Sequence, residues 1–145
     1  MCYLPLFNST AEISIGVPEN SKFQPVAPRK QKPIVFYGTS ITHGACASRP
    51  GMTHPAILGR RLDYPIVNLG FSGNGKMEPE VGALLTEIDA AAYVIDCLPN
   101  MDGDMVEERA LPLVKQLRRA RPNTPIILVE DRSFTNSWIF KSRRD

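Results

Sequence analysis

Residues 33–44 read PIVFYGTSITHG, and this stretch decides the fold. The run Ile34–Tyr37 is continuously apolar, which is typical of a strand buried on both faces of a parallel sheet. Gly38 ends the run, and Thr39 and Ser40 are residue types that favour the start of a helix. The stretch therefore predicts a strand that turns directly into a helix, with the hydroxyl of Ser40 at the junction.

The alternation of strand and helix continues toward the C-terminus. Asp104 and Glu107 form a predicted capping box for a last helix, which Pro112 is expected to bend. Strands alternating with helices predict an α/β fold whose parallel sheet is covered on both faces. Further strands are predicted at 66–70, 93–98 and 125–130, and helices at 53–62, 78–89 and from Asp104 to Ala120.

Composition excludes several classes of protein. Of the 145 residues, 43% are hydrophobic and 22% charged, and the formal net charge is +2. These values argue against global disorder and against a nucleic-acid-binding protein. No apolar stretch approaches the roughly 18 residues that a membrane helix needs. The 13 prolines, about twice average usage, predict short elements that end sharply.

The cysteines and histidines predict neither a disulfide framework nor a metal site. Cys2, Cys46 and Cys97 are odd in number and widely spaced, and no CxxC pair occurs. Adding His43 and His54 does not produce the spacing of a zinc ligand set. Cys97 lies in an apolar run and is predicted to be a small buried residue. We therefore expect no metal and no cofactor.

The first thirty residues differ from the rest of the chain. Tyr3–Phe7 and Glu12–Val17 are predicted as two short strands. The proline-rich and basic passage Pro18–Lys32 is predicted as a linker. Because two strands alone are only marginally stable in water, 1–30 are expected to be the end of another domain, and 31–145 a second one.

Three of the predicted strand ends carry residues suited to acyl transfer. Ser40 follows the first strand, Gly73 lies in the glycine-rich loop after the second, and Asn100 follows the third. Alone, Ser40 is equally a helix cap, and Gly73 and Asn100 are equally turn residues. Together they supply a nucleophile and several donors for an oxyanion, which is what acyl transfer requires. The glycine spacing matches neither a Walker A loop nor GxGxxG, so a phosphate- or nucleotide-binding role rests on that loop alone.

The same segments resemble a known family. Residues 38–41 (GTSI), 68–73 (NLGFSG) and 98–101 (LPNM) resemble, in order, blocks I, II and III of the SGNH (GDSL-like) hydrolases. The resemblance covers residues 33 to about 140 and implies a flavodoxin-like three-layer α/β/α sandwich. It implies that Ser40 is the nucleophile, and that the N–H groups of Ser40 and Gly73 with the side-chain amide of Asn100 form the oxyanion hole. Residues 47–52 and 70–75 look like a subgroup in which a small β-sandwich precedes the hydrolase domain, so that 1–30 are expected to be the remnant of that sandwich.

The family's fifth block contributes a different expectation. There the general base is a histidine preceded by an aspartate three residues earlier, and no Asp-x-x-His occurs in this chain. The α/β domain is therefore expected to be incomplete at its C-terminus, and this form weakly active or inactive. His43 lies one helical turn past Ser40, but side chains at a helix start point back along the axis, a poor angle for proton abstraction. We interpret His43 as part of the cleft wall and His54 as a helix-start residue.

Two hypotheses of different class follow. The first is a serine esterase or acylhydrolase acting through an acyl-enzyme, with a small-molecule or carbohydrate ester as substrate. The second is a non-catalytic α/β remnant that binds a ligand or self-associates as a homo-oligomer. The apolar patch at Trp138, Ile139 and Phe140 is predicted to pack on a further segment, a substrate or a second subunit. Residues 1–5 lack the features of a signal peptide, and the compartment stays open, a secreted or periplasmic complete protein included.

Overall fold

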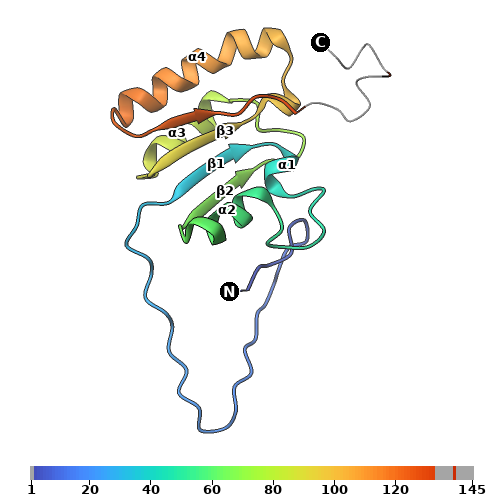
Figure 1. Cartoon of the computed structure of the whole chain (residues 1–145), viewed down its shortest axis with the longest axis vertical. Coiled ribbons are helices and arrows are strands. Elements are labelled where there is room, and N and C mark those ends of the chain that lie inside the picture. Colours follow the sequence, from blue (N-terminus) through green and yellow to red (C-terminus); the bar gives the residue numbers. More distant parts are fainter. Residues whose placement is uncertain (1, 133–138, 140–145) are drawn as a thin grey trace.

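A computed structural model describes residues 2–132 and 139 of the chain, and four parallel strands form its centre (Figure 1). The sheet order is β2-β1-β3-β4, so the first strand lies between the second and the third. Gly38, Gly70 and Asp96 share one register position at the carboxyl ends of three neighbouring strands. The strands are β1 (Ile34–Gly38), β2 (Ile66–Gly70), β3 (Ala92–Asp96) and β4 (Ile126–Leu128).

Helices cover the two faces of the sheet and make three layers. Val35 and Tyr37 of β1 pack in the main core with Leu85 of α3 and Leu117 of α4. Phe36 points to the opposite face, where its ring meets that of His54 in α2 edge-on. This confirms the predicted α/β/α sandwich. The helices are α1 (Ser40–His43), α2 (His54–Leu62), α3 (Pro79–Glu87) and α4 (Gly103–Ala120), with a 3₁₀ turn η1 (Leu98–Asn100).

Element boundaries differ from the predicted ones at the third and fourth strands and at the start of the last helix, and the fourth strand is limited to Ile126–Leu128. The third strand ends at Asp96, because the chain turns into η1 two residues later. The predicted capping box at Asp104 and Glu107 was wrong, since Asp102 is the residue whose side chain accepts from the N–H of Met105, at 2.9 Å. Asp102 has the extended backbone that a cap requires, whereas Asp104 is already helical. α4 continues through Pro112. Among the described residues, no helix is long and apolar enough to cross a membrane.

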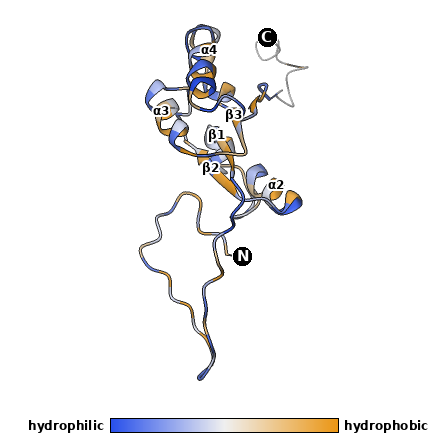
Figure 2. Cartoon of the chain, turned by 90° about the vertical axis from the view of Figure 1, so that its left-hand side faces the viewer, coloured by the Kyte–Doolittle hydropathy of each residue, from blue (hydrophilic) through white to orange (hydrophobic). Residues whose placement is uncertain are grey.

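The N-terminal region contains no strand between residues 2 and 33, so the two strands predicted there were wrong. Ile13 and Ile15 are 60% and 66% exposed, and the segment leaves the α/β unit as a long loop (Figure 2). A strand is stable only when its backbone groups are paired and one face is buried, and here neither condition holds. Of the predicted C-terminal patch, Ile139 is 57% exposed, and Trp138 and Phe140 lie outside the described residues.

Candidate functional site

Ser40 is the first residue of α1, directly beyond the carboxyl end of β1. Thr39 is the N-cap, with an extended backbone and a buried hydroxyl that accepts from the N–H of Ile41 at 3.3 Å. The N–H of Ser40 has no partner within the helix, as expected at a helix start. The predicted strand-to-helix junction is thus present. Because α1 has only four residues, its dipole is much weaker than that of a long helix.

Polar side chains from β2 and β3, the two strands that flank β1, hold this single helical turn in place. The hydroxyl of Thr42 donates to Asp96 at the end of β3, at 2.7 Å, and both residues are buried. The side-chain amide of Asn68 in β2 donates to the carbonyl of Thr42 at 2.8 Å, while its oxygen accepts from the N–H of Gly70. No sequence motif indicates a role for Thr42 or Asp96. The one available signal was a carboxylate inside the apolar run YVIDCL.

Glycines allow α1 and the loops to approach the strand ends closely. A Cβ on Gly70 would lie 2.1 Å from the backbone nitrogen of His43, and one on Gly75 would lie 2.1 Å from the carbonyl oxygen of Gly38. No side chain fits at either position. Gly73 differs, because it has a φ of +74° but faces open space. Of the three glycines in the predicted loop, Gly70 and Gly75 thus serve chain packing, and Gly73 has no such packing role.

Hydrogen bonds tie the loop with Gly73 to the other two strand ends. The N–H of Phe71 donates to the carbonyl of Gly38 at 2.9 Å, two residues before Ser40. The side-chain amide of Asn100 donates to the carbonyl of Asn74 at 2.7 Å. An amide NH₂ has two hydrogens, so this bond leaves one for another acceptor. Ser40, Gly73 and Asn100 therefore belong to three linked segments on one rim of the sheet.

Glu78 anchors the far end of the same loop. Its carboxylate accepts from the hydroxyl of buried Tyr37 and from the N–H of Lys76. Burial by itself raises the pKa of the Glu78 carboxyl. The hydrogen bonds from Tyr37, from its own N–H and from Lys76, with the charge of Arg109, outweigh burial and hold the pKa below its ordinary value. Burial raises the pKa of Tyr37 far above its ordinary value, so this hydroxyl stays protonated and donates.

Replacing Glu78 with Gln is expected to lower the free energy of unfolding at neutral pH by about 1 kcal/mol. The reason is that hydrogen bonds to a half-buried carboxylate are stronger than hydrogen bonds to an amide oxygen. The pKa of the folded state lies below 4.5, so this stabilisation is present above that value and disappears as pH falls through the folded-state pKa. Urea denaturation at about pH 7 and about pH 3.5 measures the difference. Glu80→Gln, at an exposed position, is the control. If the difference in free energy of unfolding between wild type and Glu78→Gln grew at acid pH, the stabilising role of the ionised Glu78 carboxylate would be contradicted.

Neither histidine is bonded to Ser40. His43 uses its Nε2–H to donate to the carbonyl of Leu6 at 2.5 Å, and its ring stacks on Phe7 with centroids 4.2 Å apart. His54 begins α2, as predicted, and its Nε2 lies 3.5 Å from the Asp96 carboxylate. Burial lowers the pKa of His54, and the charge of Asp96 opposes that shift. Among the described residues, no group of three or more His, Cys, Asp or Glu side chains comes together to hold a metal.

Cys97 is the buried residue that the sequence predicts. It has no exposed surface, and its thiol points to the carbonyl of Tyr37 at 3.7 Å. Burial raises the pKa of this thiol to about 12. Cys97 therefore stays protonated and unreactive at neutral pH, so it is no competing nucleophile.

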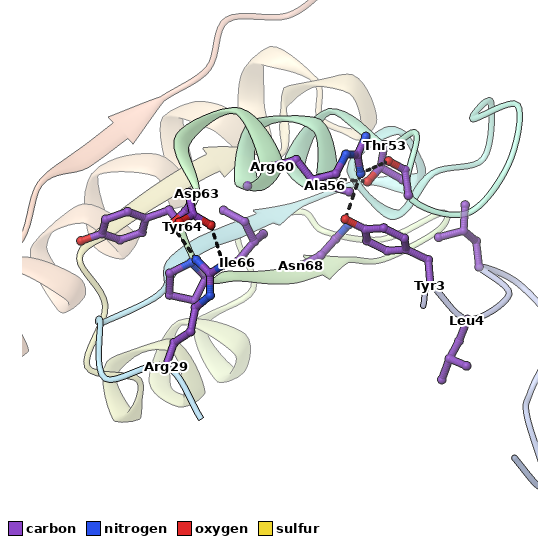
Figure 3. A pocket seen from close by; sticks show the side chains of 14 residues that line it. Tyr3, Leu4, Arg29, Thr53, Ala56, Arg60, Asp63, Tyr64, Ile66 and Asn68 are labelled. Atoms are coloured by element: carbon purple, nitrogen blue, oxygen red, sulfur yellow. Dashed lines mark hydrogen bonds and ion pairs between the residues drawn. The ribbon is translucent and has the colours of Figure 1, made fainter. Parts of the chain in front are cut away.

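A cavity of about 590 Å³ lies elsewhere, between α2, β2 and the N-terminal segment. Figure 3 shows Arg60 reaching from α2 toward Tyr3, and Arg29 toward Asp63. Neither Ser40, Gly73 nor Asn100 lines this cavity. The candidate site therefore lies apart from this cavity, which marks where the N-terminal segment rests on the α/β unit.

Comparisons with known proteins place this geometry in context. The family model described as "GDSL-like Lipase/Acylhydrolase family" matches residues 31–145. A Bacteroides ovatus ATCC 8483 protein described as a GDSL-like lipase is 44% identical, with a TM-score of 0.75 over 79% of this chain. This chain spans only 34% of the length of that protein. No curated protein matches.

Two solved structures of lower identity share the fold. AlinE4, an esterase of the SGNH-hydrolase family, is 19% identical with a TM-score of 0.53, over 81% of this chain and 68% of its own. The salicylyl-acyltransferase SsfX3, from a tetracycline biosynthetic pathway, is 18% identical with a TM-score of 0.53, over 68% of this chain and 32% of its own. At these identities the likeness concerns the fold alone.

Proposed function

The chain belongs to the GDSL-like lipase/acylhydrolase family, and from this we propose that it is a serine hydrolase that cleaves carboxylic esters through an acyl-Ser40 intermediate. Family membership supports a hydrolase of the esterase or acylhydrolase type. The geometry of the rim and the three sequence blocks support the roles that we propose for individual residues. The substrate class that we propose is a small acyl group esterified to a carbohydrate or similar alcohol, as the resemblance to the sandwich-bearing subgroup implies.

In the proposed reaction, the Oγ of Ser40 attacks the carbonyl carbon of the ester. The hydroxyl proton passes to a base, and the carbonyl oxygen becomes the oxyanion of a tetrahedral intermediate. The N–H groups of Ser40 and Gly73 and the second hydrogen of the Asn100 amide are the donors for this oxyanion. The carbon–oxygen bond to the alcohol then breaks and the alcohol leaves with a proton. Water finally attacks the acyl-Ser40 ester and releases the acid.

One observation carries the proposal: Ser40 shares a rim with donors whose loops are tied to it. Phe71 bonds to Gly38 beside the nucleophile, and Asn100 bonds to Asn74 beside Gly73. Preorganised donors of this kind stabilise a developing oxyanion without further reorganisation. Ser40 is not needed as a helix cap, because the side chain of Thr39 already caps α1.

Acylation of Ser40 tests the function directly. After incubation with p-nitrophenyl acetate and an acid quench, peptide mapping is expected to find an acetyl group on Ser40. Formation and hydrolysis of the acyl-enzyme both need a base. The acetyl adduct accumulates when its hydrolysis is slower than its formation. Imidazole added as an external base should speed its formation.

Two variants make this measurement specific. Ser40→Ala should remove the adduct, whereas Ser48→Ala, at a serine of the following loop, should leave it unchanged. Acetylation spread over lysines and other serines at equal rates, with none enriched at Ser40, would refute the assignment of the nucleophile.

A further inference from the structure

We propose that the N-terminal segment Tyr3–Phe7 is a structural part of the candidate site, in which Leu6 and Phe7 are positioning residues that hold α1 through His43. The inference rests on the proposed role of Ser40, because α1 matters to activity only if it carries the nucleophile. It assigns His43 a positioning role in place of proton transfer.

The first contact between the segment and α1 is made by the His43 ring, which uses both its edge and its face. Its Nε2–H donates to the Leu6 carbonyl, which requires the tautomer with the proton on Nε2. The ring stacks on Phe7 with an interplanar angle of 20°. The other nitrogen, Nδ1, is buried without a hydrogen-bond partner, so it accepts no proton from Ser40. A histidine used as a base has its acceptor nitrogen hydrogen-bonded to the hydroxyl, and neither nitrogen of His43 makes that bond here.

Glycines in the loop after α1 receive the apolar side chains of the segment. A Cβ on Gly44 would lie 2.7 Å from Leu6, and one on Gly51 would lie 2.6 Å from the ring of Tyr3. Of residues 2–32, only Tyr3 and Leu6 are not exposed. The segment Tyr3–Phe7 is therefore attached at defined points. By contrast, the following twenty or so residues are exposed and make almost no contact with the α/β unit.

Arg60 of α2 closes the attachment from the other side. Its guanidinium donates to the Tyr3 hydroxyl at 2.9 Å and to the Gly51 carbonyl at 2.6 Å, and it lies over the Tyr3 ring at 5.4 Å (Figure 3). One side chain thus ties the segment both to α2 and to the loop that follows α1. These contacts bury little apolar area, so they add little to the free energy of unfolding of the whole chain. We therefore expect the segment to matter mainly because it fixes the position of α1.

The consequence for Ser40 follows from the length of α1. A single helical turn is unstable alone, because few hydrogen bonds offset the ordering of its residues. Thr42 is held on the sheet side by Asp96 and Asn68. His43, on the outer side, is held by Leu6 and Phe7. Since the carbonyl of Ser40 accepts from Gly44 and Ala45, at 2.8 and 2.9 Å, loosening this end of the turn also loosens Ser40.

The test compares two phenylalanines of the same N-terminal region. Phe7 and Phe23 are 54% and 62% exposed, but only Phe7 stacks on a ring of the α/β unit. In the full 145-residue chain, Phe7→Ala should raise hydrogen exchange of the Gly44 and Ala45 amides by about 10-fold, the equivalent of about 1.4 kcal/mol of local opening. Amides of β1 and β3 should be unchanged. Phe23→Ala should change neither, and Phe7→Tyr should restore protection.

The same variants are then scored by the rate of Ser40 acetylation. We expect Phe7→Ala to lower the maximal rate about 5- to 10-fold with little change in the ester concentration at half-maximal rate, because positioning affects the chemical step more than binding. His43→Gln, which keeps an N–H donor toward Leu6 but loses the ring, should lose no more rate than Phe7→Ala, and His43→Leu, which loses both contacts, should lose more. A rate lost in His43→Gln as fully as in His43→Leu would overturn the positioning role.

The two proposals fail in different ways. If wild type never acetylates at Ser40, the proposed function fails, while amide exchange still reports whether the segment holds α1. If acetylation occurs and Phe7→Ala leaves both the exchange of Gly44 and the rate unchanged, the positioning role fails alone. Exchange that rises equally in β1 and β3 also overturns it, because this is the sign of general destabilisation.

Discussion

The 145-residue chain is expected to hydrolyse p-nitrophenyl acetate at least about 10³-fold more slowly than a typical enzyme, which turns over about 10 times per second. Its two histidines are both engaged elsewhere, His43 with Leu6 and Phe7 and His54 with Asp96. Because neither histidine is bonded to Ser40, the hydroxyl attacks without a histidine base, and the proposed oxyanion donors and proximity supply the remaining rate enhancement. Steady-state release of p-nitrophenol under conditions without added base measures this rate.

Added imidazole and two histidine variants complete the experiment. Imidazole should raise the wild-type rate above that of Ser40→Ala under identical conditions, because imidazole can take the proton of the Ser40 hydroxyl. His54→Gln should leave the residual rate unchanged. Ordinary esterase turnover that disappears in His43→Gln or His54→Gln would show that one of these rings reaches Ser40, and would contradict the arrangement described above.

Gly75→Ala is expected to destabilise the chain by about 3–5 kcal/mol or to prevent folding, the upper range for single substitutions. The added Cβ would lie 2.1 Å from the oxygen and 2.6 Å from the carbon of the Gly38 carbonyl, and the backbone has a φ of +70°. Both obstacles are backbone atoms at the end of β1, which cannot turn aside as a flexible side chain does. Urea denaturation followed by circular dichroism measures the change.

Gly73→Ala is the matched control for this substitution. Its φ of +74° is nearly the same, but nothing lies within 4 Å of the added Cβ. Only the cost of a left-handed backbone remains, about 1–2 kcal/mol. The difference between the two variants therefore isolates the steric clash. Equal losses of stability would mean that the loop shifts to accommodate the added methyl group without resistance from β1.

Much of the α/β unit could be predicted from local pattern. Continuous apolar runs marked the strands, and the spacing of apolar residues marked α3 and α4, because burial on one or two faces leaves a periodic trace in sequence. Chain order also placed Ser40, Gly73 and Asn100 on one rim, since parallel strands bring their carboxyl ends together. These inferences need no knowledge of side-chain contacts.

The errors arose where a partner decides the outcome. Glu12–Val17 has the alternation of a strand, but it forms none because no neighbouring backbone pairs with it. Asp102 caps α4 in place of Asp104, because the local backbone angles determine which carboxylate meets the free N–H groups. His43 was interpreted as part of a cleft wall, and its bond to Leu6, 37 residues away in the chain, could not be foreseen from local pattern.

By itself, the sequence determined the fold class, the order of the strands along the chain and the three segments that form the candidate site. Those properties depend on hydrophobic periodicity and on short motifs, which are local. Only the tertiary structure decided that Thr42, Asp96 and Asn68 hold α1 in place, that Gly70 and Gly75 serve packing while Gly73 is open, and that His43 faces the N-terminal segment. Such properties depend on distances between residues remote in sequence, and they are set when the strands, helices and loops pack together.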